Sequence, residues 1–255
     1  SNGRYGAGVE IEEITKPRNR IDINIIVDEG NSAKIKKINI IGNEIFTDEE
    51  LLDSFELSEG SFFSFLSNNN QYSREKLVGD IETLESYYRD RGYLKFSIES
   101  SQISLSRDKK SIFITFNVNE GKKYTINNVN IIGEIPFEEN IYINILENLK
   151  KETYSQAQIT SIEEFFVDVL GNRGYAFAEV KGDTETIDDS NQVDLTFAVI
   201  PGKKTYTRKI LFTGNHVTQD EVLRREMRQF EGAWSSNNSI AVSYTHLRAH
   251  ETDRH

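Results

Sequence analysis

Two segments of the chain alternate strictly between apolar and polar residues. The apolar positions are Ile112, Ile114, Phe116 and Val118 in the first segment, and Val193, Leu195, Phe197 and Val199 in the second. A period of two residues places the apolar side chains of a segment on one face of a β-sheet. An extended stretch precedes each segment, at 96–105 in the first case, and polar turn residues lie between. The pattern predicts two β-hairpins, each with one buried face.

Segments with a helical period precede both hairpins. The first stripe follows Ser73 and the second follows Ser155; they consist of Leu77, Ile81, Leu84 and Tyr88, and of Ile162, Phe166 and Val169. Apolar residues at intervals of three and four predict a helix with one buried face. A shorter helix is predicted before each of these. One begins at Thr47, which can form a capping box with Glu50, and the other lies around 141–149.

A short strand that ends in glycine occurs three times. The copies read KKINIIGNE at 36–44, NVNIIGE at 128–134 and KILFTGNH at 209–216. Another glycine precedes the glycine of each copy by twelve residues, and the pairs are Gly30 and Gly42, Gly121 and Gly133, and Gly202 and Gly214. Glycine permits the positive φ that a turn after a strand can require. The constant spacing predicts repeat units with a fixed join, because a flexible linker tolerates variable length.

The predicted elements recur in the order β-α-α-β-β. This order predicts an α+β fold in which the three strands of each unit form a mixed sheet that packs on two antiparallel helices. Residues 31–121 and 122–202 each contain a complete unit. Residues 1–30 contain only the closing hairpin of an earlier unit, and residues 203–240 contain only the opening strand and helix of a later one.

The first complete unit carries an insertion between its helices, in the segment SFFSFLSNNN. Its large apolar residues are Phe62, Phe63, Phe65 and Leu66. These side chains either cover the end of the sheet as a small additional core, or they form an exposed patch that binds a substrate. The sequence leaves both interpretations open.

Charge and composition argue against several classes of function. With 41 acidic and 30 basic residues, the chain has a net charge of −11, which repels nucleic-acid phosphates. The chain has no cysteine, which excludes disulfides and thiol chemistry. No apolar run approaches the roughly 18 residues of a membrane-spanning helix. The chain begins with Ser-Asn, without methionine or a signal peptide, which indicates a piece of a longer protein.

The acidic residues do not form a catalytic pattern. Adjacent carboxylate pairs occur at Glu49 and Glu50, Glu138 and Glu139, Glu163 and Glu164, and Asp188 and Asp189. Neighbouring side chains diverge on a helix or a strand, so such a pair cannot flank one scissile bond. His216 has no partner that the sequence reveals. We therefore expect no catalytic residues and no cofactor.

Residues 241–255, AVSYTHLRAHETDRH, do not continue the repeat. The segment resembles a translated sequencing adaptor, and we interpret it as a non-native tail outside the fold. His246, His250 and His255 lie in it, and the spacing of the first two could place them on one helix face as metal ligands. Because no apolar stripe supports a helix there, we expect no metal site.

The first strand of the first hairpin changes its pattern halfway. In FSIESSQISLS, Phe96 and Ile98 occupy even positions, whereas Ile103 and Leu105 occupy odd positions. The strand either bulges near Ser100 or places the second pair on the face opposite the core. In the latter case an exposed apolar pair lies on a sheet edge, where unpaired main-chain groups can bind an extended partner.

The last partial unit combines a predicted helix with many charges. Residues 218–221 predict another capping box, and Val222, Leu223 and Met227 can form its inner stripe. The remaining positions are mostly charged, and they include Arg224, Arg225, Glu226, Arg228 and Glu231. This face is either a solvated surface of ion pairs or a charged docking surface.

Three segments resemble a known family of repeats. They are PRNRIDINIIVDEG at 17–30, GDIETLESYYRDRGYLKF at 79–96 and LRREMRQFEGAW at 223–234. They are similar to the periplasmic POTRA repeats of the BamA family, the central subunits of the bacterial machinery that assembles outer-membrane β-barrels. The resemblance runs from residue 3 to about residue 240 and matches the end of the second repeat, the third, the fourth and the start of the fifth.

The resemblance implies a non-enzymatic scaffold in the periplasm, ahead of a C-terminal membrane barrel that this sequence does not include. It implies that unfolded outer-membrane proteins bind to sheet edges by β-augmentation. Ile103 and Leu105 match positions where the lipoprotein BamB docks, and Arg224 and Glu231 match contacts to the lipoprotein BamD. A POTRA array from a secretion transporter or a related barrel exporter is the alternative.

Overall fold

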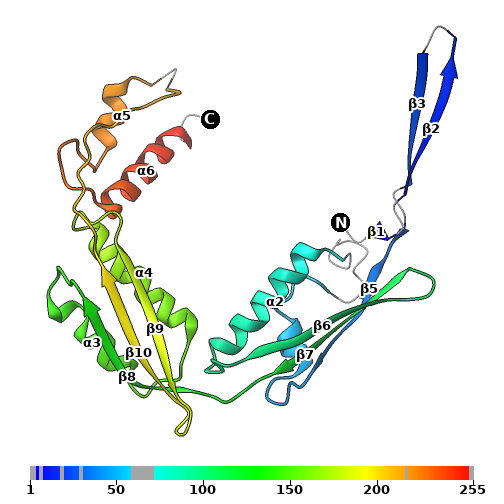
Figure 1. The fold of residues 1–255 in the computed structure, drawn as a ribbon. Coiled ribbons are helices and arrows are strands. Elements are labelled where there is room, and N and C mark those ends of the chain that lie inside the picture. Colours follow the sequence, from blue (N-terminus) through cyan, green and yellow to red (C-terminus); the bar gives the residue numbers. More distant parts are fainter. Residues whose placement is uncertain are drawn as a thin grey trace. The chain divides into compact units, whose positions relative to one another are not determined.

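The computed structural model describes residues 4–5, 8–17, 20–28, 31–58, 72–215 and 218–252. The chain forms two compact units, Ser1–Lys123 and Tyr124–His255 (Figure 1). The predicted apolar insertion with Phe62, Phe63, Phe65 and Leu66 lies outside the described residues, as does His216.

The first unit contains one sheet on two helices, one separate hairpin of β2 (Gly8–Lys16) and β3 (Arg20–Asp28), and a short antiparallel pairing of β1 (Arg4–Tyr5) with β4 (Asn31–Ser32). Its other elements are β5 (Lys34–Ile41), α1 (Asp48–Leu52), α2 (Arg74–Arg89), β6 (Ser97–Leu105) and β7 (Ser111–Asn119). The first sheet has the order β5-β7-β6, with β5 parallel and β6 antiparallel to the central strand β7.

The second unit repeats the three-stranded sheet on helices and adds α5 (Asp220–Glu226) and α6 (Asn237–Thr252). Its other elements are β8 (Thr125–Gly133), η3 (Glu139–Ile141), α3 (Ile143–Leu149), α4 (Gln156–Gly171), β9 (Glu179–Ile187) and β10 (Gln192–Ile200). The second sheet has the order β8-β10-β9, with β8 parallel and β9 antiparallel to β10. The predicted α+β fold with repeated mixed sheets is confirmed.

The central strands form the core of each sheet. All the apolar residues that the alternating pattern assigned to β7 and β10 are buried, with at most 6% of their surface exposed. The predicted stripe of α2 packs on the first sheet through Leu77, Leu84 and Tyr88. Burial of one large apolar side chain contributes roughly 1.5–3 kcal/mol, so these contacts supply most of the stabilisation of each sheet on its helices. The predicted capping box of Thr47 and Glu50 is present at α1.

The repeated glycines adopt one conformation at the end of the parallel strand. The φ angle is +98° at Gly42 and +102° at Gly133. A Cβ atom would lie 2.3 Å from the carbonyl oxygen of Val118 at the first position and 2.2 Å from that of Val199 at the second. Both the dihedral angle and the close approach of the central strand therefore require glycine, which explains why the same residue follows the parallel strand in these two copies.

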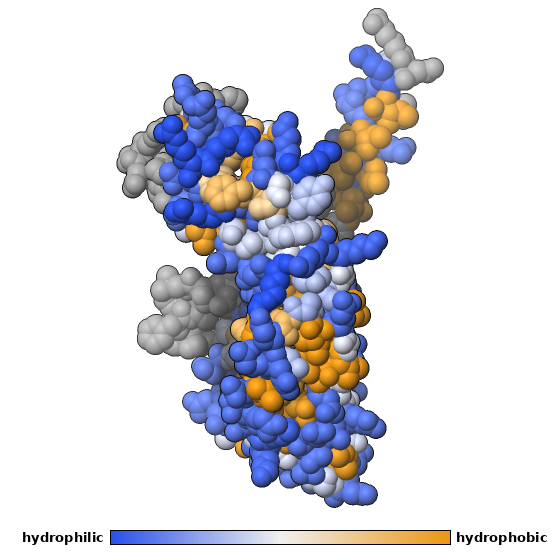
Figure 2. Space-filling view, turned by 90° about the vertical axis from the view of Figure 1, so that its left-hand side faces the viewer, coloured by the Kyte–Doolittle hydropathy of each residue, from blue (hydrophilic) through white to orange (hydrophobic). Residues whose placement is uncertain are grey.

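The hairpin of β2 and β3 has an apolar face without cover. Val9, Ile11, Ile21, Ile23 and Ile25 share this face, as the antiparallel register shows, and each is between 59% and 64% exposed. Figure 2 shows hydrophobic side chains at the surface of this hairpin. Helices cover the corresponding faces of the first and second sheets. Among the described residues, no helix and no second sheet covers this apolar face of the hairpin.

The C-terminal segment contradicts one prediction. Residues 241–252 are helical and form most of α6, although the sequence places no apolar stripe there. Ser243 is 1% exposed, and its hydroxyl oxygen accepts hydrogen bonds from the amides of Arg228 at 2.7 Å and Gln229 at 3.3 Å. The expectation that this segment lies outside the fold is therefore wrong for these residues, because a buried polar contact holds the helix. Its interpretation as non-native stays a prediction.

A buried carboxylate joins three parts of the first unit. Glu120 is 7% exposed and accepts hydrogen bonds from the amide of Glu44 at 3.0 Å, the amide of Ile45 at 3.2 Å and the hydroxyl of Tyr88 at 2.7 Å. Burial, and then the neighbouring Glu120, raise the pKa of Tyr88, so its hydroxyl stays protonated and remains a donor. Glu120 thus fixes the loop after β5 to α2.

Candidate partner-binding site

The edge strand β6 contains the bulge that its sequence pattern allowed. Ile98 pairs with Val118, and Ser100 pairs with the preceding residue of β7, Asn117. Glu99 is therefore an additional residue without a partner of its own. The bulge near Ser100 is confirmed, and it shifts the parity of every later residue of the strand.

The bulge returns Ile103 and Leu105 to the face that carries the core. Ile103 lies opposite Ile114, and Leu105 lies opposite Ile112. The alternative that places this pair on the face opposite the core is therefore wrong. Leu105 packs against the core as a partly buried side chain, whereas Ile103 is 41% exposed. Of the two predicted residues, only Ile103 offers a large exposed apolar surface at the sheet edge.

β6 has only one neighbouring strand among the described residues. In the described part of the chain, the outward main-chain N–H and C=O groups of β6 form no hydrogen bond with a side chain. The hydroxyl of Ser100 accepts from the side-chain Nδ2 of Asn117 at 2.6 Å, a contact that involves no main-chain group. Such an edge can pair with an extended chain through main-chain hydrogen bonds. The edge of β6 and the exposed side chain of Ile103 therefore form one surface with both polar and apolar contacts available.

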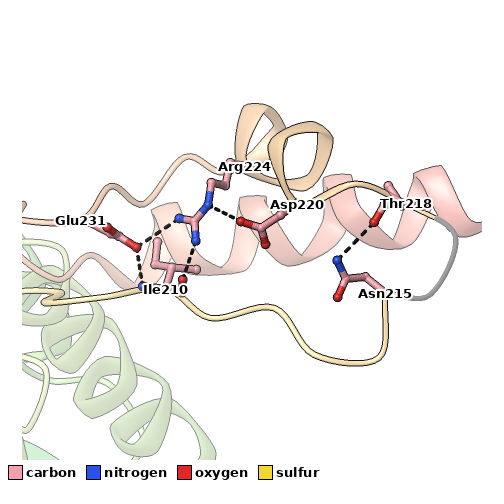
Figure 3. A network of polar contacts seen from close by, with 6 residues as sticks. All are labelled: Ile210, Asn215, Thr218, Asp220, Arg224 and Glu231. Carbon is pink, nitrogen blue, oxygen red and sulfur yellow. Dashed lines mark hydrogen bonds and ion pairs between the residues drawn. The ribbon is translucent and has the colours of Figure 1, made fainter.

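The predicted residues Arg224 and Glu231 contact each other in the second unit (Figure 3). The guanidinium of Arg224 donates to Glu231 at 3.1 Å, to Asp220 at 2.7 Å and to the carbonyl oxygen of Ile210 at 2.9 Å. The carboxylate of Glu231 accepts from the amide of Ile210 at 2.8 Å. Arg224 and Glu231 thus bind both main-chain groups of Ile210. Asp220 joins them from one helical turn earlier, a spacing of four residues that is typical of ion pairs on a helix.

Hydrogen bonds set the protonation states in this cluster. The bond to Asp220, and then that to Glu231, raise the pKa of Arg224. The amide of Ile210, and then Arg224, lower the pKa of Glu231. These shifts favour the charged forms of Arg224 and Glu231, so this pair presents both signs of charge on an exposed surface.

The third copy of the glycine-ended strand does not form a strand. Residues 207–213 carry no strand assignment, and Gly214 has no atom within 4 Å of its ideal Cβ position. In the first two copies the central strand occupies that position. The predicted capping box at 218–221 is also wrong, because α5 begins at Asp220 after Gln219, which makes no side-chain cap. No residue of α5 is buried, so its predicted inner stripe does not form a core.

The adjacent carboxylate pairs have structural contacts. In each pair one residue accepts a hydrogen bond from a group nearby: Glu50 from Thr47, Glu138 from Arg173, Glu163 from Gly182, and Asp188 from Tyr124. The described residues contain no group of three or more His, Cys, Asp and Glu side chains placed to hold a metal ion. The imidazole of His246, which the sequence suggested as a possible metal ligand, lies 3.6 Å from the carboxylate of Glu226.

None of the helices described combines the length and the apolar character that a membrane span requires.

The chain matches a family of repeats over most of its length. The POTRA family, described as a surface antigen variable number repeat, matches residues 33–121 and 124–202. These two matches contain the first and the second sheet with their helices.

Several relatives carry the name outer membrane protein assembly factor BamA. The protein of Neisseria meningitidis serogroup B is 33% identical over 234 residues, which are 91% of this chain and 29% of the relative. That of Buchnera aphidicola is 31% identical over 240 residues, which are 94% of this chain and 39% of the relative. The chain therefore spans only about a third of the length of these relatives.

A solved structure supports the same assignment. The crystal structure of repeats POTRA3–5 of BamA from Haemophilus influenzae is similar with a TM-score of 0.73 and 27% identity, and the match covers 86% of each chain. This match includes several repeats in one alignment. The order of the repeats along this chain therefore agrees with that in the Haemophilus influenzae protein, as does the fold of the repeats. The chain therefore belongs to the POTRA family, as a series of repeats of the BamA type, which form the periplasmic portion of a bacterial outer-membrane protein.

Proposed function

We propose that the chain is a non-enzymatic scaffold for the assembly of outer-membrane proteins, and that it binds unfolded β-barrel clients by β-augmentation at β6. The observation that carries this proposal is the edge of β6, with its outward main-chain groups beside the exposed side chain of Ile103. Main-chain hydrogen bonds give affinity with little sequence preference, which suits a scaffold with many different clients.

The repeat architecture suits weak, successive contacts. Each sheet has one edge strand that is antiparallel to its central strand, namely β6 in the first sheet and β9 in the second. Several weak sites on one chain raise the effective concentration of a client without holding it permanently. A scaffold that must pass its client onward gains from this arrangement, because no single contact is strong enough to trap the client.

Two surfaces are proposed to dock accessory lipoproteins. A BamB-like protein binds at Ile103 and Leu105, where the partly buried Leu105 supports the exposed Ile103 from within. A BamD-like protein binds at Arg224 and Glu231. Because these two already pair with each other, the partner engages the outer surface of an ordered cluster of both charges.

Substitution of Ile103 tests the edge of β6. Ile103→Glu is expected to weaken the binding of a ten-residue peptide that copies an outer-membrane barrel strand by about tenfold, since it places a charge on the apolar contact. The melting temperature should hardly change, because the side chain is exposed. Isothermal titration calorimetry and thermal denaturation measure the two effects on the same variant.

Two control variants separate binding from folding. Ile41→Glu changes an exposed isoleucine on β5, at the other edge of the same sheet, and should leave peptide binding intact. Leu105→Glu should instead destabilise the first unit by about 3 kcal/mol, because it brings a charge toward the core. Unchanged peptide affinity in Ile103→Glu, or an equal loss in Ile41→Glu, would contradict the proposed edge.

A further inference from the structure

The edge strand β9 of the second sheet differs from β6 in one contact. The carboxylate oxygen Oε1 of Glu163, on α4, accepts a hydrogen bond from the amide of Gly182, in the middle of β9, at 2.5 Å. β9 pairs with β10 on one side only, and an amide that donates to a helix side chain is one that points away from β10. Glu163 therefore occupies a main-chain donor that an added strand would need.

The glycine at this position makes the contact possible. A Cβ atom on Gly182 would lie 2.8 Å from a methyl carbon of Ile159 and 3.2 Å from Oε1 of Glu163. The absence of a side chain thus lets α4 approach the edge strand closely enough for its carboxylate to reach the backbone. An isolated glycine within a strand is a signal of such an approach, and β9 contains one.

The first sheet has no equivalent of this contact. Opposite Phe116 of β7, β6 carries Ser101, whereas opposite the matching Phe197 of β10, β9 carries Gly182. Among the described residues, no side chain of α2 bonds to the backbone of β6, and α2 does not approach β6 as closely as α4 approaches β9. The first sheet therefore has an open edge at β6, whereas Glu163 occupies a main-chain donor at the β9 edge of the second sheet.

We propose that Glu163 is a built-in cap that keeps the β9 edge closed to added strands, so that an extended client pairs first with β6. The inference rests on the proposed β-augmentation and assigns different roles to the two edges. A client must displace Glu163 to pair with β9. Glu163 already lines a hollow beside α4 and β9, together with Glu164, Val167, Asp168 and Val180, so the displaced carboxylate has an open space next to it.

Substitution of Glu163 tests the cap. Glu163→Ala is expected to speed the hydrogen exchange of the Gly182 amide and to tighten the binding of the barrel-strand peptide at β9 roughly tenfold, because the peptide no longer competes with a hydrogen bond to a charged group. Glu163→Gln should fall between this variant and the unsubstituted chain, since its amide oxygen can still accept. Chemical-shift changes of Val180–Thr186 in two-dimensional NMR report binding at β9 separately from β6.

Glu164→Ala is the matched control. Glu164 is next in the helix and lines the same hollow, but its substitution leaves the bond to Gly182 intact and should change neither measurement. Unchanged affinity at β9 in Glu163→Ala, with normal binding at β6, would overturn the cap and leave the proposed function standing. Binding at neither edge in any variant would overturn both.

Discussion

Gly133→Ala is expected to destabilise the second unit by about 4 kcal/mol. An L side chain at its φ of +102° costs roughly 1–2 kcal/mol. In addition, the new Cβ would lie 2.2 Å from the carbonyl oxygen of Val199, so β8 and β10 must separate where they pair. Chemical denaturation, followed by the exchange of the β10 amides, measures the loss.

Gly214→Ala provides a control in the same unit. Its φ of +83° carries a similar backbone penalty, but no atom lies within 4 Å of the ideal Cβ position. We expect a loss of only about 1 kcal/mol. Equal losses in both variants would show that the backbone angle alone requires the repeated glycine, and that the contact with the central strand contributes nothing.

Glu120→Ala is expected to destabilise the first unit by about 4 kcal/mol. The substitution removes an acceptor that serves two partly buried backbone amides and the buried hydroxyl of Tyr88, and it leaves that hydroxyl without a partner. Tyr88→Phe removes only one of the three bonds and should cost about 1 kcal/mol. If the two variants lose the same free energy of unfolding, the loop after β5 does not depend on Glu120.

The regular parts of the fold could be predicted because they repeat simple patterns. The alternation in β7 and β10 identifies the buried strands, and the glycine that ends β5 and β8 identifies the turn. Each pattern reflects a physical requirement that acts on neighbouring residues, namely burial of one face or a positive φ. Short stretches of sequence are therefore sufficient to predict these strands and turns.

The candidate site depended on contacts that local sequence does not contain. The parity change in β6 allowed either a bulge or an apolar pair on the face opposite the core. Only the pairing of β6 with β7 shows that the strand contains the bulge. Arg224 contacts Glu231 and the backbone of Ile210, which lie outside its helix, so only the fold of the chain brings these groups together. Likewise, the backbone contact of Ser243 explains α6, although no apolar stripe predicted that helix.

Hydrogen exchange of β6 in the presence of a client reports directly whether an added strand pairs with this edge. With the barrel-strand peptide bound, we expect alternate amides of Ser97–Leu105, those that point outward, to exchange more slowly, while the amides of β7 keep their slow rates. The cluster around Arg224 should show no change with this peptide. Protection that is absent from β6 while the peptide remains bound elsewhere on the chain would contradict β-augmentation at this edge.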